Sequence, residues 1–248
     1  MNRGFYISGV AGHMTGNKLD TISHNLANVN TAGFMRDRAA FSTILANMGN
    51  NGSGTKAAAY MTMDHQFISP DKGILHKTGN DFDFAIQGQG FFKVNMVDKQ
   101  GNVTQGYTRA GDFHLDAEGT LLSEGGLPIL DDADQKITLP PGTLTATQDG
   151  KLSVNSAPVA RVGLYQIPDM SKVHKASGTV LVTDAANVQK ADTSISLQQG
   201  TLEGSNVNSV LMMVEMMQNS RSNQSMMKLL EQYNQQEGLL NDKVGRVA

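Results

Sequence analysis

The feature that most constrains the fold is a change in the hydrophobic period along the chain. Towards both ends, apolar residues recur every three or four positions, which is the spacing of one face of an α-helix. From about residue 81 to about residue 200 the spacing becomes two, as in Phe92, Val94 and Met96, and turn pairs such as Asp149-Gly150 separate the short alternating runs. The pattern predicts an α+β fold with one helix at each end and a mainly β middle domain.

The N-terminal helix is expected to carry a narrow apolar seam. Its apolar residues follow each other at steps of three and four, with one step of five between Met14 and Leu19 that breaks the register. A seam this narrow is typical of a helix that packs against a partner helix, as in a coiled coil, and not against a broad core. The seam residues are Ile7, Val10, Met14, Leu19, Ile22, Leu26 and Val29.

The first helix is expected to end within residues 28–33. Asn is a poor helix former, and Gly33 can adopt the left-handed conformation that closes many helices. Asn30, Gly33 and Phe34 therefore form the predicted helix-end turn. Because Asn also tolerates this conformation, a Gly33→Asn change is expected to be milder than Gly33→Val.

The C-terminal helix repeats this arrangement. Asn208 is a predicted N-cap, and the polar residues 218–224 are expected to weaken the helix between two apolar stretches. Methionines cluster between residues 212 and 227, which favours an adaptable partner surface. The seam consists of Val210, Val214, Met217, Met226, Leu230, Tyr233 and Leu240. Because a terminal helix has no core of its own, both seams are predicted to be assembly interfaces through which the chain self-associates.

The patterns divide the chain into four segments. These are an N-terminal helix at residues 1–34, a linker region at 35–80, a β-rich middle domain at 81–204 and a C-terminal helix at 205–248 that pairs with the first helix. The linker interpretation rests on residues 47–54, whose Asn, Gly and Ser content is typical of a loop.

Composition argues against several classes of function. A formal net charge of −3 with 17% charged residues does not favour a nucleic-acid surface. The chain has no cysteine, so a disulfide, a thiolate metal site and a cysteine nucleophile are impossible. The first ten residues lack the apolar run of a cleavable signal peptide, and no stretch approaches the roughly 18 apolar residues of a membrane span. We therefore expect neither nucleic-acid binding nor membrane insertion.

Candidate residues for chemistry fit structural roles at least as well. Asp81 and Asp83 could act as general acid and base, but their spacing also fits a solvated strand face. Residues 131–134 lack the glycine and the closing glutamate of an EF-hand loop, and residues 88–90 lack the third glycine of a dinucleotide fingerprint. The histidines have no metal-ligand spacing. The sequence predicts no catalytic residue, no cofactor and no metal, and therefore a protein that is not an enzyme.

Four motifs, in order along the chain, resemble those of the flagellar rod and hook proteins. They are SHNLANVNTAGF at residues 23–34, GQGFFKV at 88–94, YTRAGDF at 107–113 continuing to Asp116 and Gly119, and GTLEGSNVN at 200–208 with a helix after it. His24, where the family commonly has Asn, and the methionines from Met212 onward depart from the family's pattern. Within the family the chain is most similar to the proximal rod proteins, on its length and on residues 75–86, and distal rod proteins are the runner-up.

The resemblance implies a structural subunit of the bacterial flagellar basal-body rod. It implies that the terminal helices pair as a coiled coil on the inner wall of a hollow axial tube, while the β domain faces outward. The implied partners are other flagellar rod and hook proteins and the flagellar export apparatus, which passes subunits unfolded and without a cleavable signal peptide. The implied location is the rod that spans the periplasm and carries torque to the hook. The alternatives are a hook-type axial subunit, a cell-wall hydrolase using Asp81 and Asp83, and a cytoplasmic coiled-coil adaptor.

Overall fold

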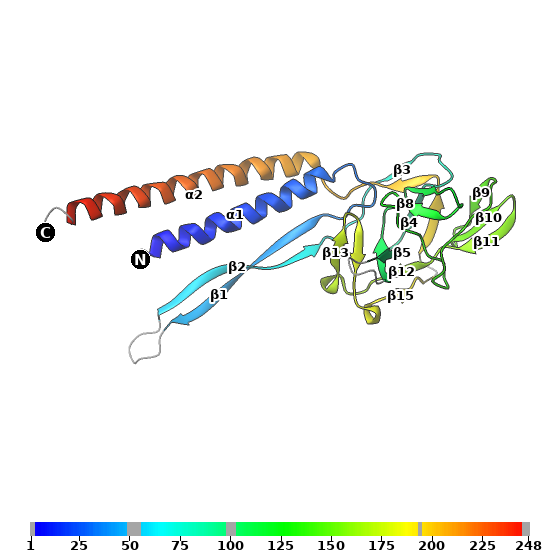
Figure 1. The fold of residues 1–248 in the computed structure, drawn as a ribbon, viewed down its shortest axis with the longest axis horizontal. Helices are drawn as coiled ribbons and strands as arrows, with labels where there is room; N and C mark the ends of the chain where they lie inside the picture. The colour runs from blue at the N-terminus through cyan, green and yellow to red at the C-terminus, as the bar shows by residue number, and fades with distance from the viewer. Residues whose placement is uncertain (1–2, 49–55, 98–102, 193–194, 245–248) are drawn as a thin grey trace. The chain divides into compact units, whose positions relative to one another are not determined.

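The structure is a computed structural model that describes residues 3–48, 56–97, 103–192 and 195–244. It confirms the α+β class, because α1 (Arg3–Ala27) and α2 (Ser209–Val244) stand at the two ends of the chain and strands fill the middle (Figure 1). Over the described ranges, the helices lack the combination of length and apolar character that crossing a membrane requires. The strands are β1 (Asp37–Met48), β2 (Lys56–Ile68), β3 (Leu75–Lys77), β4 (Phe84–Gln87), β5 (Phe91–Val97), β6 (Val103–Thr108), β7 (Phe113–Leu115), β8 (Leu121–Ser123), β9 (Leu144–Ala146), β10 (Lys151–Val154), β11 (Ala157–Arg161), β12 (Leu164–Gln166), β13 (His174–Ser177), β14 (Val180–Val182), β15 (Gln189–Lys190), β16 (Ser196–Gln199) and β17 (Thr201–Glu203), with short 3-10 helices at Met170–Lys172 and Ala185–Asn187.

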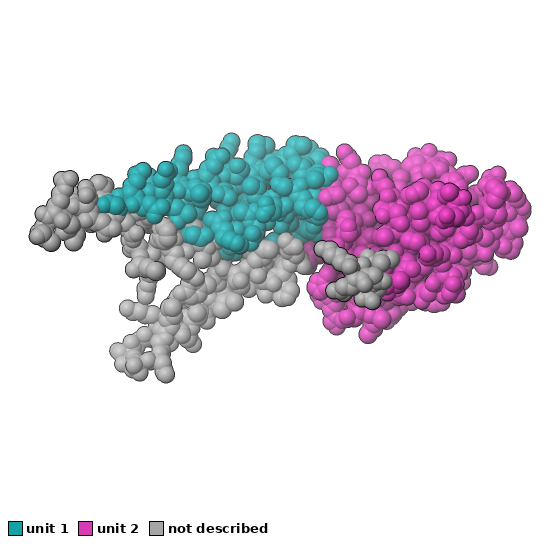
Figure 2. Space-filling model, in the orientation of Figure 1, with its two compact units in different colours: residues 1–27, 37–66, 208–248 teal, residues 28–36, 67–207 magenta. Residues whose placement is uncertain are grey.

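The chain divides into two compact units (Figure 2). Unit 1 comprises Met1–Ala27, Asp37–Gln66 and Asn208–Ala248, and it therefore contains both helices, β1 and most of β2. Unit 2 comprises Asn28–Arg36 and Phe67–Val207, and it contains the remaining strands.

Unit 2 is built from antiparallel sheets. The largest has the strand order β13-β14-β6-β5-β12-β15, and a smaller one has the order β11-β10-β9. The pairs β16-β4, β17-β3 and β7-β8 are further sheets in the described part of this unit. The predicted turn at Asp149-Gly150 joins β9 to β10, and Gly150 has the positive φ of +81° that such a tight turn requires.

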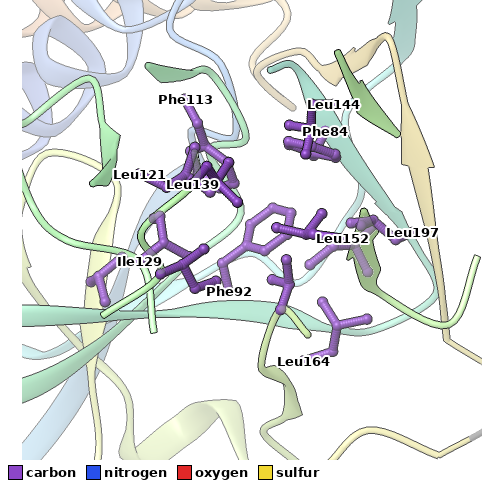
Figure 3. Close-up of a cluster of buried hydrophobic side chains, with 14 of the residues drawn as sticks. Phe84, Phe92, Phe113, Leu121, Ile129, Leu139, Leu144, Leu152, Leu164 and Leu197 are labelled. Carbon is purple, nitrogen blue, oxygen red and sulfur yellow. The ribbon is translucent and has the colours of Figure 1, made fainter. Parts of the chain in front are cut away.

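The core of unit 2 collects apolar residues from the alternating runs (Figure 3). Phe92 and Val94, which alternate on β5, are fully buried, and the ring of Phe92 meets the ring of Phe113 edge-on at 5.0 Å between centroids. Burying each such side chain contributes roughly 1.5–3 kcal/mol relative to leaving it in water. Because this core draws only on strands and loops of unit 2, the unit has its own source of stability.

Residues 35–80, predicted to be a linker region, carry three strands. β1 and β2 pair with each other, and β3 pairs with β17. Of the residues that suggested a loop, 47–54, the first two form the end of β1, and residues 49–54 lie outside the described residues. The flanking strands were missed because Ala residues dilute the alternation of β1 and β2, and Ala has a low strand propensity.

Candidate assembly interface

Within unit 1, α1 and α2 lie side by side and run in opposite directions (Figure 1). The Nδ2 atom of Asn219 donates a hydrogen bond to the backbone oxygen of Thr15 at 2.7 Å. Further along the pair, a Cβ atom placed on Gly12 would lie 3.9 Å from Cγ of Met226. The two terminal helices of one chain therefore contact each other directly.

The N-terminal seam residues that are described lie on or near the less exposed side of α1. Ile22 is buried, and Met14, Leu19 and Leu26 are half-buried. Ile7 and Val10 belong to α1, but their side chains lie outside the described residues.

Val29 requires a correction, because α1 ends at Ala27. Val29 lies in the turn that follows, so it cannot continue a helical seam. The turn forms because the backbone N–H of Thr31 bonds to the oxygen of Asn28 at 3.2 Å, while the Thr31 hydroxyl donates to the side chain of the same Asn28. The short polar side chain of Asn competes with helix continuation at this point.

The C-terminal seam residues fall on two different sides of α2. Met226 and Leu230 are half-buried, whereas Val210, Val214 and Met217 are 70%, 42% and 56% exposed. Tyr233 and Leu240 belong to α2, but their side chains lie outside the described residues. The first three seam residues therefore point away from α1 within the chain, and of the described later ones Met226 and Leu230 share its side.

Sequence reasoning missed the row of α2 that is least exposed. Met212 and Asn219 are buried, at 2% and 7% exposure. The complete row has steps of four, three, four, three and four, and it consists of Met212, Met216, Asn219, Asn223, Met226 and Leu230. A search for apolar residues alone cannot find this row, since two of its positions are Asn.

The predicted N-cap of α2 is confirmed. The side-chain oxygen of Asn208 accepts the backbone N–H of Leu211 at 3.0 Å, which satisfies one of the free donors of the first turn. The polar stretch 218–224 does not interrupt the helix, because α2 is continuous from Ser209 to Val244. Its hydrogen bond to α1 through Asn219 supplies a tertiary contact that helix propensity does not include.

The helix-end turn is packed tightly into unit 2. Gly33 has the predicted positive φ, at +64°, but it does not cap α1, which ends six residues earlier at Ala27. Its N–H donates to the backbone oxygen of Glu203 at 2.8 Å. A Cβ atom at Gly33 would lie 2.1 Å from the backbone nitrogen of Ala110. Phe34 is 1% exposed and lies under the ammonium group of Lys175, which is 3.8 Å from the ring centroid. Asn30, the third turn residue, is exposed.

A buried ion pair lies next to this turn. Arg109 and Glu203 are each 5% exposed at their side chains, and the shortest distance between Nη2 and Oε2 is 2.6 Å. Arg109 also donates to the backbone oxygens of Ile86, Gly88 and Gly90. The other carboxylate oxygen of Glu203 accepts the N–H of Gly73 at 2.9 Å. Such a pair is costly to break on one side, because the remaining charge would be buried without its partner.

The four sequence motifs therefore meet at one place, which we call the motif junction: Gly33, Gly88, Gly90, Arg109, Ala110 and Glu203. Asn206 extends it, because its side-chain oxygen accepts the N–H of Arg36 at 2.7 Å and its amide donates to the oxygen of Asp71 at 2.7 Å. The contacts of the junction hold the turn 28–36 and the end of β17 in fixed positions within unit 2.

The acidic candidates have structural contacts. Asp83 is buried and accepts hydrogen bonds from Thr78 Oγ1 and Asn80 Nδ2 at 2.5 and 2.9 Å, whereas Asp81 is exposed. Asp131 closes its own loop by accepting backbone N–H groups of Ala133 and Gln135. Asp134 pairs with Lys93 at 2.6 Å, and the hydrogen bond from Lys93 lowers the pKa of the Asp134 carboxyl.

The carboxyl group of Asp112 has a strongly raised pKa. Burial, followed by a hydrogen bond with Glu124 and the nearby charge of Asp83, raises the pKa of Asp112 to about 7. Asp112 borders a cavity of about 470 Å³ together with Glu124, Thr31 and Ala32. Its Oδ1 atom is buried and has no hydrogen-bond partner in the described part of the chain.

Three family models match the chain, in order along it. The model described as "Flagella basal body rod protein" matches residues 15–34. "Flagellar hook protein FlgE/F/G D1 domain" matches residues 85–157, and "Flagellar basal body rod FlgEFG protein C-terminal" matches residues 198–242. The matched ranges include the end of α1, most of unit 2's core strands and α2, which together define a protein of the flagellar axial structures.

Individual relatives agree with the family models. The flagellar basal-body rod protein FlgF of Caulobacter vibrioides is 31% identical over 93% of this chain and 93% of its own length. FlgG of Buchnera aphidicola subsp. Schizaphis graminum is 31% identical over 82% of this chain and 85% of its own length. The hook protein FlgE of C. vibrioides is 38% identical but matches 49% of this chain and 21% of its own length. The chain thus belongs to the flagellar rod and hook protein family. It is a structural subunit of the flagellar basal-body rod, similar over most of its length to FlgF and FlgG.

Proposed function

We propose that the chain polymerises through its terminal helices into the hollow axial shaft of the rod, which transmits torque and conducts exported subunits. In this proposal its neighbours are further copies and other rod and hook proteins, with a proximal position in the rod, as the similarity to FlgF favours. The single observation that carries the proposal is the exposed apolar row at the start of α2.

That row is large for an isolated chain. The row consists of Val210, Leu211, Met213, Val214 and Met217, which are 70%, 45%, 50%, 42% and 56% exposed. Apolar area transferred out of water contributes roughly 25 cal/mol per Å², so covering these side chains would stabilise an assembly considerably. A contiguous apolar surface on a helix is typical of a site that another protein covers.

The inward-facing row on the opposite side of α2 supports a coiled coil as the arrangement of α1 and α2. The residues from Met212 to Leu230 that face inward follow steps of four and three, which is the heptad spacing of coiled-coil helices. One side of α2 would then pack on α1 of its own chain, and the exposed row would contact helices of neighbouring subunits. A head-to-tail contact of this kind generates an open helical filament.

Export through the flagellar export apparatus, without a cleavable signal peptide, belongs to the same proposal. Isolated helices are marginal in water because nucleation is unfavourable. Helices that become stable only on packing suit a subunit that passes a channel unfolded and orders at the growing end.

The test compares two variants with the same charge change on α2. Val214→Asp places a carboxylate in the exposed apolar row, whereas Gln224→Asp places one at an exposed polar position of the same helix. Cells producing only Val214→Asp should export the subunit yet lack hooks and filaments, and cells producing Gln224→Asp should swim. Normal swimming of both variants would rule out the exposed row as an assembly contact.

A further inference from the structure

Both terminal helices interrupt their apolar rows, and the two interruptions lie opposite each other in unit 1. On α1 the interruption is the five-residue step from Met14 to Leu19, which contains Thr15. On α2 it is the polar stretch 218–224, which contains Asn219. The hydrogen bond from Asn219 Nδ2 to the Thr15 oxygen, at 2.7 Å, joins the two interruptions.

Because Asn219 is buried, losing this hydrogen bond would cost free energy. Asn219 is 7% exposed, so its carboxamide would be buried without a partner if the bond were lost. Leaving a buried polar group unsatisfied costs more free energy than the net gain of an average hydrogen bond. Asn223 offers an internal comparison, because it occupies the same row one turn later but is half-buried and makes no side-chain hydrogen bond to any described residue.

Around Thr15, small residues leave the backbone of α1 accessible to Asn219. Gly12 and Gly16 flank Thr15 and have no side chain to cover the backbone on that side. If α2 slid by one heptad towards the C-terminal end of α1, Asn219 would face Ile22, which is buried, with Leu19 and Leu26 close by in the same row. A polar residue at one position of a helix seam is a known means of fixing register, because all other alignments leave it unsatisfied.

We propose that Asn219 sets the register of the α1–α2 pair by bonding to the Thr15 carbonyl, so that α2 accepts only a helix with a matching interruption. Asn219 is therefore a positioning residue. The proposal rests on the helix pair that the proposed rod assembly uses, but it concerns alignment within one subunit and not contacts between subunits.

The experiment exploits the absence of cysteine from the chain. Gly12→Cys with Met226→Cys reports the observed register, because a Cβ at Gly12 would lie 3.9 Å from Cγ of Met226. Leu19→Cys with Met226→Cys reports a slip of one heptad, since Leu19 lies about 10 Å further along α1. Disulfides need Cα atoms within roughly 7 Å, so each pair traps one alignment. The measured quantity is the ratio of the two disulfide yields within the purified full-length chain under mild oxidation.

The expected result is a ratio strongly in favour of the first pair in the otherwise unchanged chain. Asn219→Leu should lower that ratio by about tenfold, which corresponds to about 1.4 kcal/mol. Asn219→Gln, which keeps a carboxamide donor, should preserve most of the selectivity. The matched control Asn223→Leu should leave the ratio unchanged, although it makes the same change on the same row.

Four results would overturn the proposal. The first is an unchanged ratio in Asn219→Leu. The second is an equal loss of the ratio in Asn219→Leu and Asn223→Leu, which would mean that the polarity of the stretch matters and not the bond. The third applies if Asn219→Leu abolishes helicity: Asn219→Gln then decides, and a tenfold loss of the ratio in Asn219→Gln contradicts the proposal. The fourth is the absence of both disulfides in the otherwise unchanged chain. That result would remove the helix pair of the isolated subunit without touching the rod function, which the swimming test of Val214→Asp addresses separately.

Discussion

Gly33 is constrained twice. Its φ of +64° favours glycine, and asparagine is the usual second choice for this conformation. The second constraint is the backbone of Arg109 and Ala110, whose atoms would lie 2.1–2.5 Å from any added Cβ. Real Cβ atoms do not approach backbone atoms this closely, and the ion pair of Arg109 with Glu203 prevents that backbone from retreating. The expectation that Gly33→Asn is milder than Gly33→Val is therefore replaced.

We predict that Gly33→Ala, Gly33→Asn and Gly33→Val all destabilise unit 2 severely, by more than about 3 kcal/mol. Thermal unfolding of the purified variants measures this directly. Gly79→Asn is the matched control, because Gly79 has a φ of +78° but nothing within 4 Å of an added Cβ, so it should unfold close to the unsubstituted protein. A Gly33→Asn protein as stable as Gly79→Asn would show that conformation alone governs the position.

Asp112 gives the fold a pH dependence with a defined sign. Its pKa is raised to about 7 in the folded state from an ordinary value of 3.8, so folding takes up a proton between those values. The contribution of Asp112 to stability is most favourable below about pH 4 and becomes progressively less favourable as the pH rises towards 7. Above about pH 7 the carboxylate is charged, partly buried and close to Glu124 and Asp83.

Asp112→Asn should therefore stabilise the protein at pH 8 by about 1–2 kcal/mol and change little at pH 4, with partial exposure of the group reducing the effect. Urea unfolding at the two pH values measures the difference, and the exposed Asp81→Asn is the control for a change in net charge. Equal stabilisation at both pH values would mean that packing, and not ionisation, is responsible.

Among the helices and strands, features that depend on neighbouring residues were predicted from the sequence, whereas the pairing of distant segments was not. The spacing of apolar residues placed both helices and the alternating strands around Phe92, and the residue type placed the Asn208 cap, because each depends on neighbours within a few residues. The register of α2 was not predictable in this way. Its inward row contains Asn219, which is compatible with burial only because Thr15, distant in the sequence, accepts its hydrogen bond. The strands β1 and β2 were missed for a related reason, since their pairing compensates for weak alternation.

The predicted N-terminal seam can be tested independently of α2. Leu26→Asp places a carboxylate at a half-buried position near the end of α1, and an unpaired charge in a helix contact costs several kcal/mol. We expect cells producing only this variant to export the subunit but to lack hooks and filaments. Unit 2 has a separate core, so its melting temperature should be unchanged.

Ser23→Asp is the control for Leu26→Asp, because Ser23 is exposed one turn earlier on the same helix. Cells with this control should swim. If cells with Leu26→Asp swam equally well, the N-terminal seam would not be an assembly contact.

At the scale of the whole molecule, the sequence motifs were recognisable, but the sequence did not show that they meet in space. Residues 33, 88–90, 109–110 and 203 are far apart in the sequence, yet the hydrogen bonds of Arg109 and Glu203 bring them together in unit 2. Convergence of this kind depends on the order of strands in several sheets, which hydrophobic alternation does not encode. The motifs are therefore separate segments of the sequence, but in the structure they form one junction.

The motif junction also defines which part of the isolated subunit should resist proteolysis. The turn 28–36 belongs to unit 2, since Gly33 bonds to Glu203 and Arg36 bonds to Asn206. We predict that brief digestion removes both helices and stops near residues 28 and 207, because few of the described side chains of α1 and α2 are buried, whereas unit 2 has two large buried clusters. A cut between residues 37 and 66 would leave the 28–36 segment bound to unit 2 through these contacts.

Mass spectrometry of the fragments that remain together in gel filtration identifies the boundaries. The Gly12→Cys/Met226→Cys disulfide should delay loss of the helices, and rapid cleavage within 103–192 while the helices persist would contradict the prediction.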